Sequence, residues 1–209
     1  MKIVAISDTH GMHDLLSLPK GDMLIHAGDV SGRGRLNEVK AFVQWFSQQD
    51  FKYKIFIAGN HDFYFENASI EDIKELIPDN VIYLNDSGVT IEGINIWGSP
   101  IQPHFGRWAF NRHRGAAIDK HWELIPRNTD ILLTHGPPKG ILDETFHPQN
   151  VGCEMLRLRI INEIQPKYSI FGHIHEAYGQ VQENNIHFIN ASVVNLHYQL
   201  VNAPIVFEV

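Results

Sequence analysis

The feature that most constrains this chain is a recurring design in which a short apolar segment ends in side chains able to bind metals. The clearest case is residues 54–58, whose isoleucines and phenylalanine are typical of a buried β-strand. Gly59 follows, and an amide, an imidazole and a carboxylate then come in succession at Asn60, His61 and Asp62. Gly-Asn is also common turn chemistry, so this segment alone does not distinguish a site from a plain turn.

The same design recurs along the chain, which favours a site over a series of turns. Further apolar segments occupy residues 2–7, 23–27, 130–134 and 168–171. The polar residues that follow the segments are Asp8, His10, Asp29, Asn60, His61, His135, His173 and His175. In open α/β sheets, ligands bind at the carboxyl ends of the strands. We therefore expect these side chains to converge at one edge of a sheet.

Length, composition and charge limit the class of protein. With 209 residues, of which 44% are hydrophobic and 20% charged, we expect one domain spanning residues 1–209 with a sizeable core. The net charge of −7 disfavours a broad surface for nucleic-acid phosphates, so no nucleic-acid partner is expected. No pattern indicates an oligomeric state.

The cysteine content, the start of the first strand and the length of the apolar runs bear on the cellular compartment. The single cysteine, Cys153, cannot form an internal disulfide and is interpreted as a small buried apolar residue. The first strand is expected to begin almost at the first residue, which leaves no room for a targeting segment. No apolar run approaches the roughly 20 residues of a membrane span. These features predict a cytoplasmic protein without a membrane partner.

Hydrophobic periodicity predicts alternating strands and helices in the first half and mostly strands after residue 80. Helices are expected at residues 36–48, 70–76, 115–124 and 153–164. Additional short strands are expected at residues 81–84, 89–91, 94–98, 179–182, 186–190 and 205–208, with a long aromatic-rich loop at 99–111. The pattern favours an α/β fold with two packed sheets and outer helices.

The polar residues after the strands have the chemistry of a metal centre for hard ions. They offer oxygen and nitrogen donors and no thiolate, which disfavours structural zinc and soft metals. Such donors suit two divalent ions, and Asp29 could bridge both because its strand is expected to lie between the others. Two such ions with Asp8, Asp29 and a bridging hydroxide would leave a charge of roughly +1, which favours an anionic substrate. Paired ions of this kind clamp the attacking and leaving oxygens in phosphoryl displacement.

The motifs, taken in chain order, resemble those of a known superfamily. DTH at Asp8, GD at Asp29, GNHD at Asn60, H at His135 and GHIH at His173 are similar to the calcineurin-like metallophosphoesterase pattern. The closer resemblance is to the MPPED-type metallophosphodiesterase branch, through ISDTHG, LIHAGDV, IAGNHDF, DSGVT, GSPIQPHFGRWAFN, DILLTHGPP and FGHIHEAYG. The resemblance spans nearly the whole chain. It implies a four-layer α/β/β/α sandwich of two mixed sheets flanked by helices.

The resemblance also implies a role for each matching residue. The ligands of the first metal would be Asp8, His10, Asp29 and His175, and those of the second would be Asp29, Asn60, His135 and His173. Mn²⁺ is the first expectation for both ions, with Fe, Zn, Ni or Mg as alternatives. His61 would bind no metal; it would stabilise the phosphoryl oxygens and protonate the leaving oxygen.

Departures from the family pattern bear on the substrate. Related protein phosphatases have an Asp and an Arg before the glycine at Gly34, where this chain has Gly32 and Arg33. Arg33 therefore matches a phosphate-contacting Arg, the alternative being a solvated loop residue. The Asp that would orient the catalytic His is missing, which disfavours protein-phosphatase activity. His173, which some MPPED-type members lack, is present and implies an intact second metal site.

We predict a dinuclear metal-dependent phosphodiesterase for small phosphodiesters, with cyclic nucleotides as candidates. In this hypothesis a metal-bound hydroxide attacks phosphorus and His61 assists the leaving group. Trp108, Phe105 and Phe110 could stack on a base, or they could instead pack under their loop. The alternatives are a phosphomonoesterase or nucleotide pyrophosphatase with the same centre, and a non-catalytic interaction module such as the retromer subunit of this fold. The complete ligand set disfavours the module.

Overall fold

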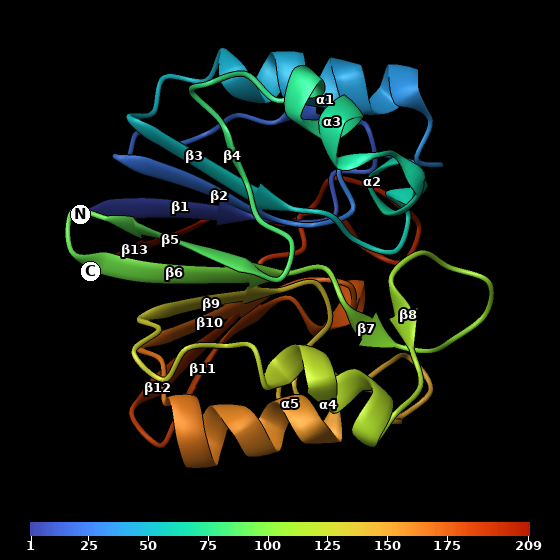
Figure 1. The fold of residues 1–209 in the computed structure, drawn as a ribbon, viewed down its shortest axis with the longest axis vertical. Helices are drawn as coiled ribbons and strands as arrows, with labels where there is room; N and C mark the ends of the chain where they lie inside the picture. The colour runs from blue at the N-terminus through green and yellow to red at the C-terminus, as the bar shows by residue number, and fades with distance from the viewer.

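The computed structural model describes residues 1–209 and has two stacked β-sheets with helices on both outer faces (Figure 1). The first sheet has five strands in the order β13-β1-β2-β3-β4, and the second has six in the order β11-β12-β10-β9-β6-β5. The strands of the first sheet are β1 (Lys2–Ile6), β2 (Met23–Ala27), β3 (Tyr53–Ile57), β4 (Ile82–Tyr83) and β13 (Ile205–Glu208). Those of the second are β5 (Ser87–Ile91), β6 (Ile94–Ser99), β9 (Ile131–Thr134), β10 (Tyr168–Phe171), β11 (Gly179–Glu183) and β12 (Ile186–Asn190). The expected α/β/β/α sandwich is confirmed.

Both sheets are mixed, with parallel strands at the centre. Strands β1, β2, β3 and β4 pair in parallel, and β13 pairs antiparallel with β1. In the second sheet β6, β9, β10 and β12 pair in parallel, while β5 and β11 are antiparallel outer strands. Parallel strands end at a common edge, so the residues after β1, β2 and β3 gather together, as do those after β9 and β10.

The apolar runs of the central strands are continuous because both of their faces are covered. Ile25 and Ile55 of the first sheet lie in one cluster with Ile131 of the second, which forms the core between the sheets. The intervening residues Leu24 and Phe56 belong to the other large cluster, where they pack with helical side chains. Burial on both faces produces runs of apolar residues instead of the alternation seen in half-exposed strands.

The helices of the two outer layers are α1 (Leu36–Ser47), α3 (Ile70–Leu76), α4 (Ala116–Trp122) and α5 (Glu154–Arg159). α1 and α3 cover the first sheet, and α4 and α5 cover the second (Figure 1). The expected helix at 153–164 is correct in place, but its last turn is the π-helical η2 (Ile160–Ile164), closed by a hydrogen bond from the Gln165 N–H to the Ile160 carbonyl. Gln165 precedes Pro166 and takes a left-handed conformation, which ends the helix. None of the helices combines the length and apolar character needed to cross a membrane.

Several short elements were not predicted. They are η1 (His13–Leu15), α2 (Phe63–Asn67), β7 (Gln102–Pro103), β8 (Asn111–Arg112) and η3 (His175–Ala177). α2 is stabilised by tertiary contact, since the Phe65 ring lies 5.5 Å from Phe56 and 4.7 Å from Tyr83 between ring centroids. β7 and β8 pair in parallel at the two ends of the expected loop 99–111. Elements this short contain no periodicity that a sequence could reveal.

Candidate metal centre

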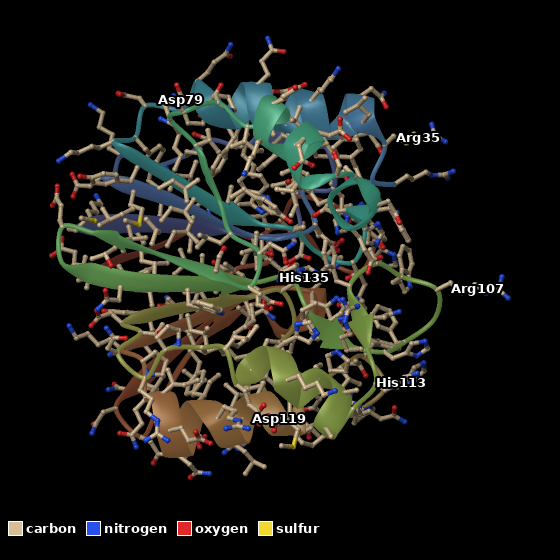
Figure 2. The ribbon with its side chains drawn as sticks, viewed as in Figure 1. Arg35, Asp79, Arg107, His113, Asp119 and His135 are labelled. Carbon is tan, nitrogen blue, oxygen red and sulfur yellow. The ribbon has the colours of Figure 1, made fainter.

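The polar residues that follow the strands converge where the edges of the two sheets meet. Asp8 and His10 follow β1, Asp29 follows β2, and Asn60 and His61 follow β3. His135 follows β9, and His173 and His175 follow β10. Figure 2 shows His135 between the two sheets, at the carboxyl ends of their strands. Each sheet therefore supplies one side of a single cluster.

The cluster is continuous and rich in donors. Its ligand atoms form three overlapping groups, each lying within 4.8 Å, and these are Asp8–His10–His175, His10–Asp29–His61 and Asp8–Asp29–His135. Asn60 joins the cluster because its Oδ1 lies 2.9 Å from Nε2 of His135. His173 joins it through its ring, whose centroid is 5.0 Å from that of His135. The structure thus brings together every residue that the sequence predicts to bind metal.

Backbone strain is concentrated in these residues. Asp8, His10, Asp29 and His173 have φ angles of 58°, 45°, 56° and 67°, in the left-handed region that side-chain-bearing residues rarely adopt. Each such residue costs on the order of 1–3 kcal/mol and persists only where its surroundings impose the conformation. Such strain is typical of functional sites and here turns the side chains at the strand ends toward one another.

Two glycines of the motifs leave the space that the carboxylates occupy. A Cβ atom at Gly59 would collide with the carboxylate of Asp29. A Cβ atom at Gly172 would collide with the carboxylate of Asp8 and with the side chain of Ser7. The glycines in GNHD and GHIH are therefore required by the close approach of buried carboxylates to backbone.

Nitrogen and oxygen atoms that can carry lone pairs approach one another closely in the cluster, which fits the binding of cations. Nδ1 of His135 donates to the Ala27 carbonyl at 3.0 Å, which leaves Nε2, 2.9 Å from Oδ1 of Asn60, as the nitrogen that holds either a proton or a cation. The Nε2 atoms of His10 and His175 lie only 3.3 Å apart. Such pairs need a proton or a positive ion between them. The donor set of oxygen and imidazole nitrogen suits divalent ions such as Mn, Fe, Ni or Zn.

The electrostatics of the cluster also favour bound cations. Burial raises the pKa of Asp8 and Asp29, but hydrogen bonds and charges of His175 and His135, respectively, outweigh burial and hold both pKa values below the ordinary range. Against the effect of burial, Asp29 raises the pKa of His135 to about 9. Burial lowers the pKa of His10 to about 4 and that of His173 to about 3, so both rings are neutral and able to bind metal at pH 7.

His61 is held with one ring nitrogen toward the cluster. Its Nδ1 donates to the Gly32 carbonyl at 2.7 Å, and its backbone N–H donates to Oδ1 of Asp29 at 2.8 Å. Nε2 lies 4.0 Å from Oδ2 of Asp29, close enough to face any group bound there. The orienting carboxylate that the sequence lacks at this position is thus replaced by a backbone carbonyl.

The cluster opens into a cavity of about 200 Å³, which we name the mouth and which is partly lined by aromatic side chains. Trp108 is half-buried and stacks on His61, and the Phe105 ring lies 5.1 Å from that of His173. Phe110 is instead buried in the core under the loop, so of its two expected roles the structure shows packing and not a position open to a base. Arg33 is exposed and forms no side-chain hydrogen bond or ion pair, so its contact with substrate stays a prediction.

Sequence reasoning missed a second wall of the mouth. Tyr198 and Leu196 also line the cavity, and the Tyr198 ring lies 4.8 Å from that of His10. They belong to the segment between β12 and β13, which has no motif. Tyr198 has a φ of 55°, so a strained turn brings it to the site. No local pattern in the sequence could have revealed this placement.

Asp62 ends the GNHD motif, and the sequence pattern assigns it no role, but the structure does. Its buried carboxylate accepts hydrogen bonds from the N–H groups of Val30, Ser31 and Gly59 at 3.1, 2.9 and 2.8 Å. It also accepts from the Ser31 hydroxyl at 2.6 Å. Asp62 therefore ties the loop that carries Asp29 to the loop that carries His61.

The fold and the site together define a metallophosphoesterase. The model of the calcineurin-like phosphoesterase family matches residues 1–177, so the chain belongs to this family. Metallophosphoesterase domain-containing protein 1 of Homo sapiens is 42% identical over 229 residues, which cover 99% of this chain and 70% of the human protein. A UPF0046 protein of Caenorhabditis elegans is 38% identical over 222 residues, covering 100% of this chain and 75% of its own length.

A solved structure shares the fold at low sequence identity. Phosphopantetheinyl hydrolase from Mycobacterium tuberculosis superposes with a TM-score of 0.62 and 17% identity, covering 94% of this chain and 90% of that protein. Tyr198 and Leu196 lie beyond the residues that the family model matches. The wall that they form therefore does not belong to the part of the chain that the family model describes.

Proposed function

We propose that this protein is a dinuclear metal-dependent phosphodiesterase that hydrolyses small phosphodiesters, with cyclic nucleotides among the candidates. The observation that carries the proposal is the continuous cluster of Asp8, His10, Asp29 and His135, toward which Nε2 of His61 is directed. The protein's membership of the calcineurin-like phosphoesterase family supports phosphoester hydrolysis as the class of reaction.

The ligands divide into two sets that share Asp29. The first ion would be held by Asp8, His10, Asp29 and His175, and the second by Asp29, Asn60, His135 and His173. Asp29 suits the shared position because its Oδ1 lies 3.4 Å from Nε2 of His135 while its Oδ2 lies 3.8 Å from Nε2 of His10. When bound, divalent ions supply Lewis acidity, which acidifies water and neutralises charge on phosphoryl oxygens. Mn²⁺ is the ion we propose first.

His61 is the group proposed to protonate the leaving oxygen. The Gly32 carbonyl accepts the proton on Nδ1, which keeps Nε2 available to carry a second proton toward the substrate. The face of the Trp108 indole lies against the same imidazole and restricts the orientation of its ring. His61 can then donate from Nε2 as the P–O bond to the leaving group breaks.

The charges around the mouth favour a diester over a dianionic monoester. The residues that line the cavity include Glu176 and no lysine or arginine. Arg107, at the tip of the loop that carries Trp108, projects away from the body of the protein (Figure 2). A monoester or a pyrophosphate would bring at least one more negative charge, and the mouth offers no lysine or arginine side chain to pair with it.

Relative rates on bis-p-nitrophenyl phosphate and p-nitrophenyl phosphate test this proposal, because both release the same chromophore. With the Mn²⁺-loaded protein, we expect the higher kcat/KM for the diester. A higher value for the monoester would favour the alternative of a phosphomonoesterase with the same centre. Arg33→Ala offers a separate test of substrate contact, which a raised KM would support.

A further inference from the structure

A second cavity, of about 360 Å³, adjoins the mouth of the metal centre. We name it the annex; its main walls are Pro103, Phe105, Pro137, Val151, His173 and Ile174. Phe105 and His173 also line the mouth, so the two spaces share a wall. The ring of Phe105 packs edge-to-face against that of His173, with ring centroids 5.1 Å apart.

The annex has no free positive charge. Its one strong cation, Arg114, donates to the carbonyls of Gly152 and Val151 at 2.8 and 2.6 Å and to the carboxylate of Glu154 at 2.5 Å. The guanidinium is therefore already neutralised and hydrogen-bonded. A second phosphate in the annex would find no lysine and no arginine other than the paired Arg114, whereas proline, valine, isoleucine and phenylalanine side chains suit a neutral, flat or apolar group.

The wall of the annex is held in place before any substrate binds. The Gly152 N–H donates to Oδ2 of Asp143 at 2.8 Å, and the same oxygen accepts from the Gly140 N–H at 2.9 Å. On the far side of this loop, the Phe146 N–H donates to Oε1 of Glu176 at 2.7 Å. Because the walls are already ordered, a ligand that binds in the annex does not lose affinity to their ordering.

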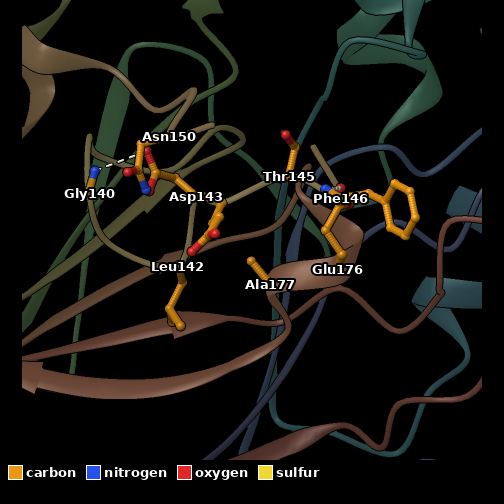
Figure 3. A pocket seen from close by; sticks show the side chains of 9 residues that line it. Gly140, Leu142, Asp143, Thr145, Phe146, Asn150, Glu176 and Ala177 are labelled. Atoms are coloured by element: carbon orange, nitrogen blue, oxygen red, sulfur yellow. Dashed lines mark hydrogen bonds between the residues drawn. The ribbon is translucent and has the colours of Figure 1, made fainter. Parts of the chain in front are cut away.

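The larger cavity beside this loop does not compete for the substrate. It has a volume of about 470 Å³, and Asp143, Glu144 and Glu176 line it (Figure 3). Its acidic walls would repel an anionic phosphoester. The annex is the adjoining space whose chemistry matches an organic substituent on phosphorus.

We infer that the annex binds the organic group that stays on phosphorus after hydrolysis, and that this group is neutral and flat or apolar, such as an aryl group or a nucleoside. The inference rests on the proposed function. His61 lines the mouth and not the annex, so the leaving group belongs on the His61 side and the retained group on the His173 side. Water forms the new P–O bond, the leaving alcohol departs with the proton from His61, and the monoester keeps the annex-bound group.

Two diesters with the same leaving group test the inference. Phenyl p-nitrophenyl phosphate and methyl p-nitrophenyl phosphate differ only in the retained group. We expect the wild-type protein to have a kcat/KM about tenfold or more higher for the phenyl ester, since the annex would remove the apolar surface of the phenyl ring from water. Val151→Trp, which fills the annex, should remove most of this ratio, and Val151→Phe should reduce it partway.

The matched control is Val181→Trp, because Val181 is 43% exposed on β11 and lines none of the described cavities. This variant should keep the wild-type ratio. Thermal unfolding midpoints establish that each variant is folded. An unchanged phenyl-to-methyl ratio in folded Val151→Trp and Val151→Phe would overturn the inference.

A binding measurement separates failure of the inference from failure of the proposed function. Methyl phenylphosphonate and methyl methylphosphonate, whose methoxide leaving group departs very slowly, are titrated calorimetrically into the Mn²⁺-loaded protein. Preferential binding of the phenyl compound that Val151→Trp abolishes supports the annex even if no diester is hydrolysed. If both diesters are hydrolysed without any phenyl preference in rate or binding, the inference that the annex binds the retained group is overturned, while the proposed phosphodiesterase activity is supported.

Discussion

The indole ring of Trp108 stacks on the imidazole ring of His61, with ring centroids 4.3 Å apart and planes inclined by 27°. A second contact that constrains the imidazole is the hydrogen bond from its Nδ1 to the Gly32 carbonyl. Together the two contacts fix the orientation of the His61 ring, because this chain has Gly32 where related protein phosphatases have the carboxylate that orients the catalytic histidine. Trp108 is thus positioned to act through His61 as well as at the mouth of the site.

Replacing Trp108 should reveal which of these two roles dominates. If the indole mainly orients His61, Trp108→Leu lowers kcat about tenfold with little change in KM, because the ring gains freedom to leave its productive orientation. Trp108→Phe, which keeps a stacking face, should recover much of the loss. A raised KM with an unchanged kcat would show that Trp108 contacts substrate and does not position His61.

Removing the imidazole of His61 should reduce turnover while leaving metal binding intact. We expect His61→Ala to lower kcat on a phosphodiester by about 10²–10⁴-fold, which is the usual contribution of a general acid. Elemental analysis should find the same metal content as in the wild-type protein. His187→Ala, at an exposed position on β12, is the matched control and should keep full activity. Undiminished turnover in His61→Ala would refute the assigned role.

Removal of metal should destabilise the protein. Asp8 and Asp29 are buried next to each other, and without cations only histidines offset their charges. An ion present at 100 times its dissociation constant adds about 2.7 kcal/mol to the free energy of unfolding. Calorimetry should show a lower unfolding midpoint after chelation and recovery with Mn²⁺. Asp29→Asn should lose this recovery; a wild-type midpoint insensitive to chelation would contradict the metal centre.

The buried His26 should make the protein less stable in acid. Its Nδ1 accepts a hydrogen bond from the Gly28 N–H at 3.2 Å, its Nε2 lies 2.9 Å from Oγ1 of Thr9, and burial lowers its pKa to about 3. The unfolded chain binds a proton near pH 6.5 while the folded chain does not, so stability falls as the pH drops below about 6.5 toward 3.

Denaturant unfolding of chelated protein measures this effect. From pH 7 to pH 5 the free energy of unfolding should fall by about 2 kcal/mol more in the wild-type protein than in His26→Gln. Chelation in both samples removes the separate effect of pH on metal binding. Equal pH dependence in the two proteins would show that His26 is protonated in the folded state.

Much of the fold could be predicted because it depends on local patterns. Short apolar runs indicated buried strands, and residues 70–76 formed a helix with the predicted bounds. The convergence of the polar residues followed from one physical rule, that parallel strands end at a common edge. Asp8, Asp29 and His135 could be placed together without knowledge of any contact.

The remaining features depend on tertiary contacts that leave no local signal. Gly32 accepts the hydrogen bond from His61 with its backbone carbonyl. Every residue has such a carbonyl, so the residue type at this position gives no sign of the contact. Tyr198 reaches the site through a strained turn, and Phe110 is buried although it sits in an aromatic-rich loop like Trp108. The annex arises only when β7, the loop after β9 and the residues before α5 are packed together.

The most direct test of the central claim is hydrolysis of bis-p-nitrophenyl phosphate by chelator-treated protein, with and without added Mn²⁺. We expect negligible turnover without metal and clear turnover once Mn²⁺ is restored, because Asp8, Asp29 and the surrounding histidines form a centre that fits divalent cations. Absence of turnover with every divalent ion tried, in protein that calorimetry shows to bind those ions, would contradict the assignment as a phosphodiesterase.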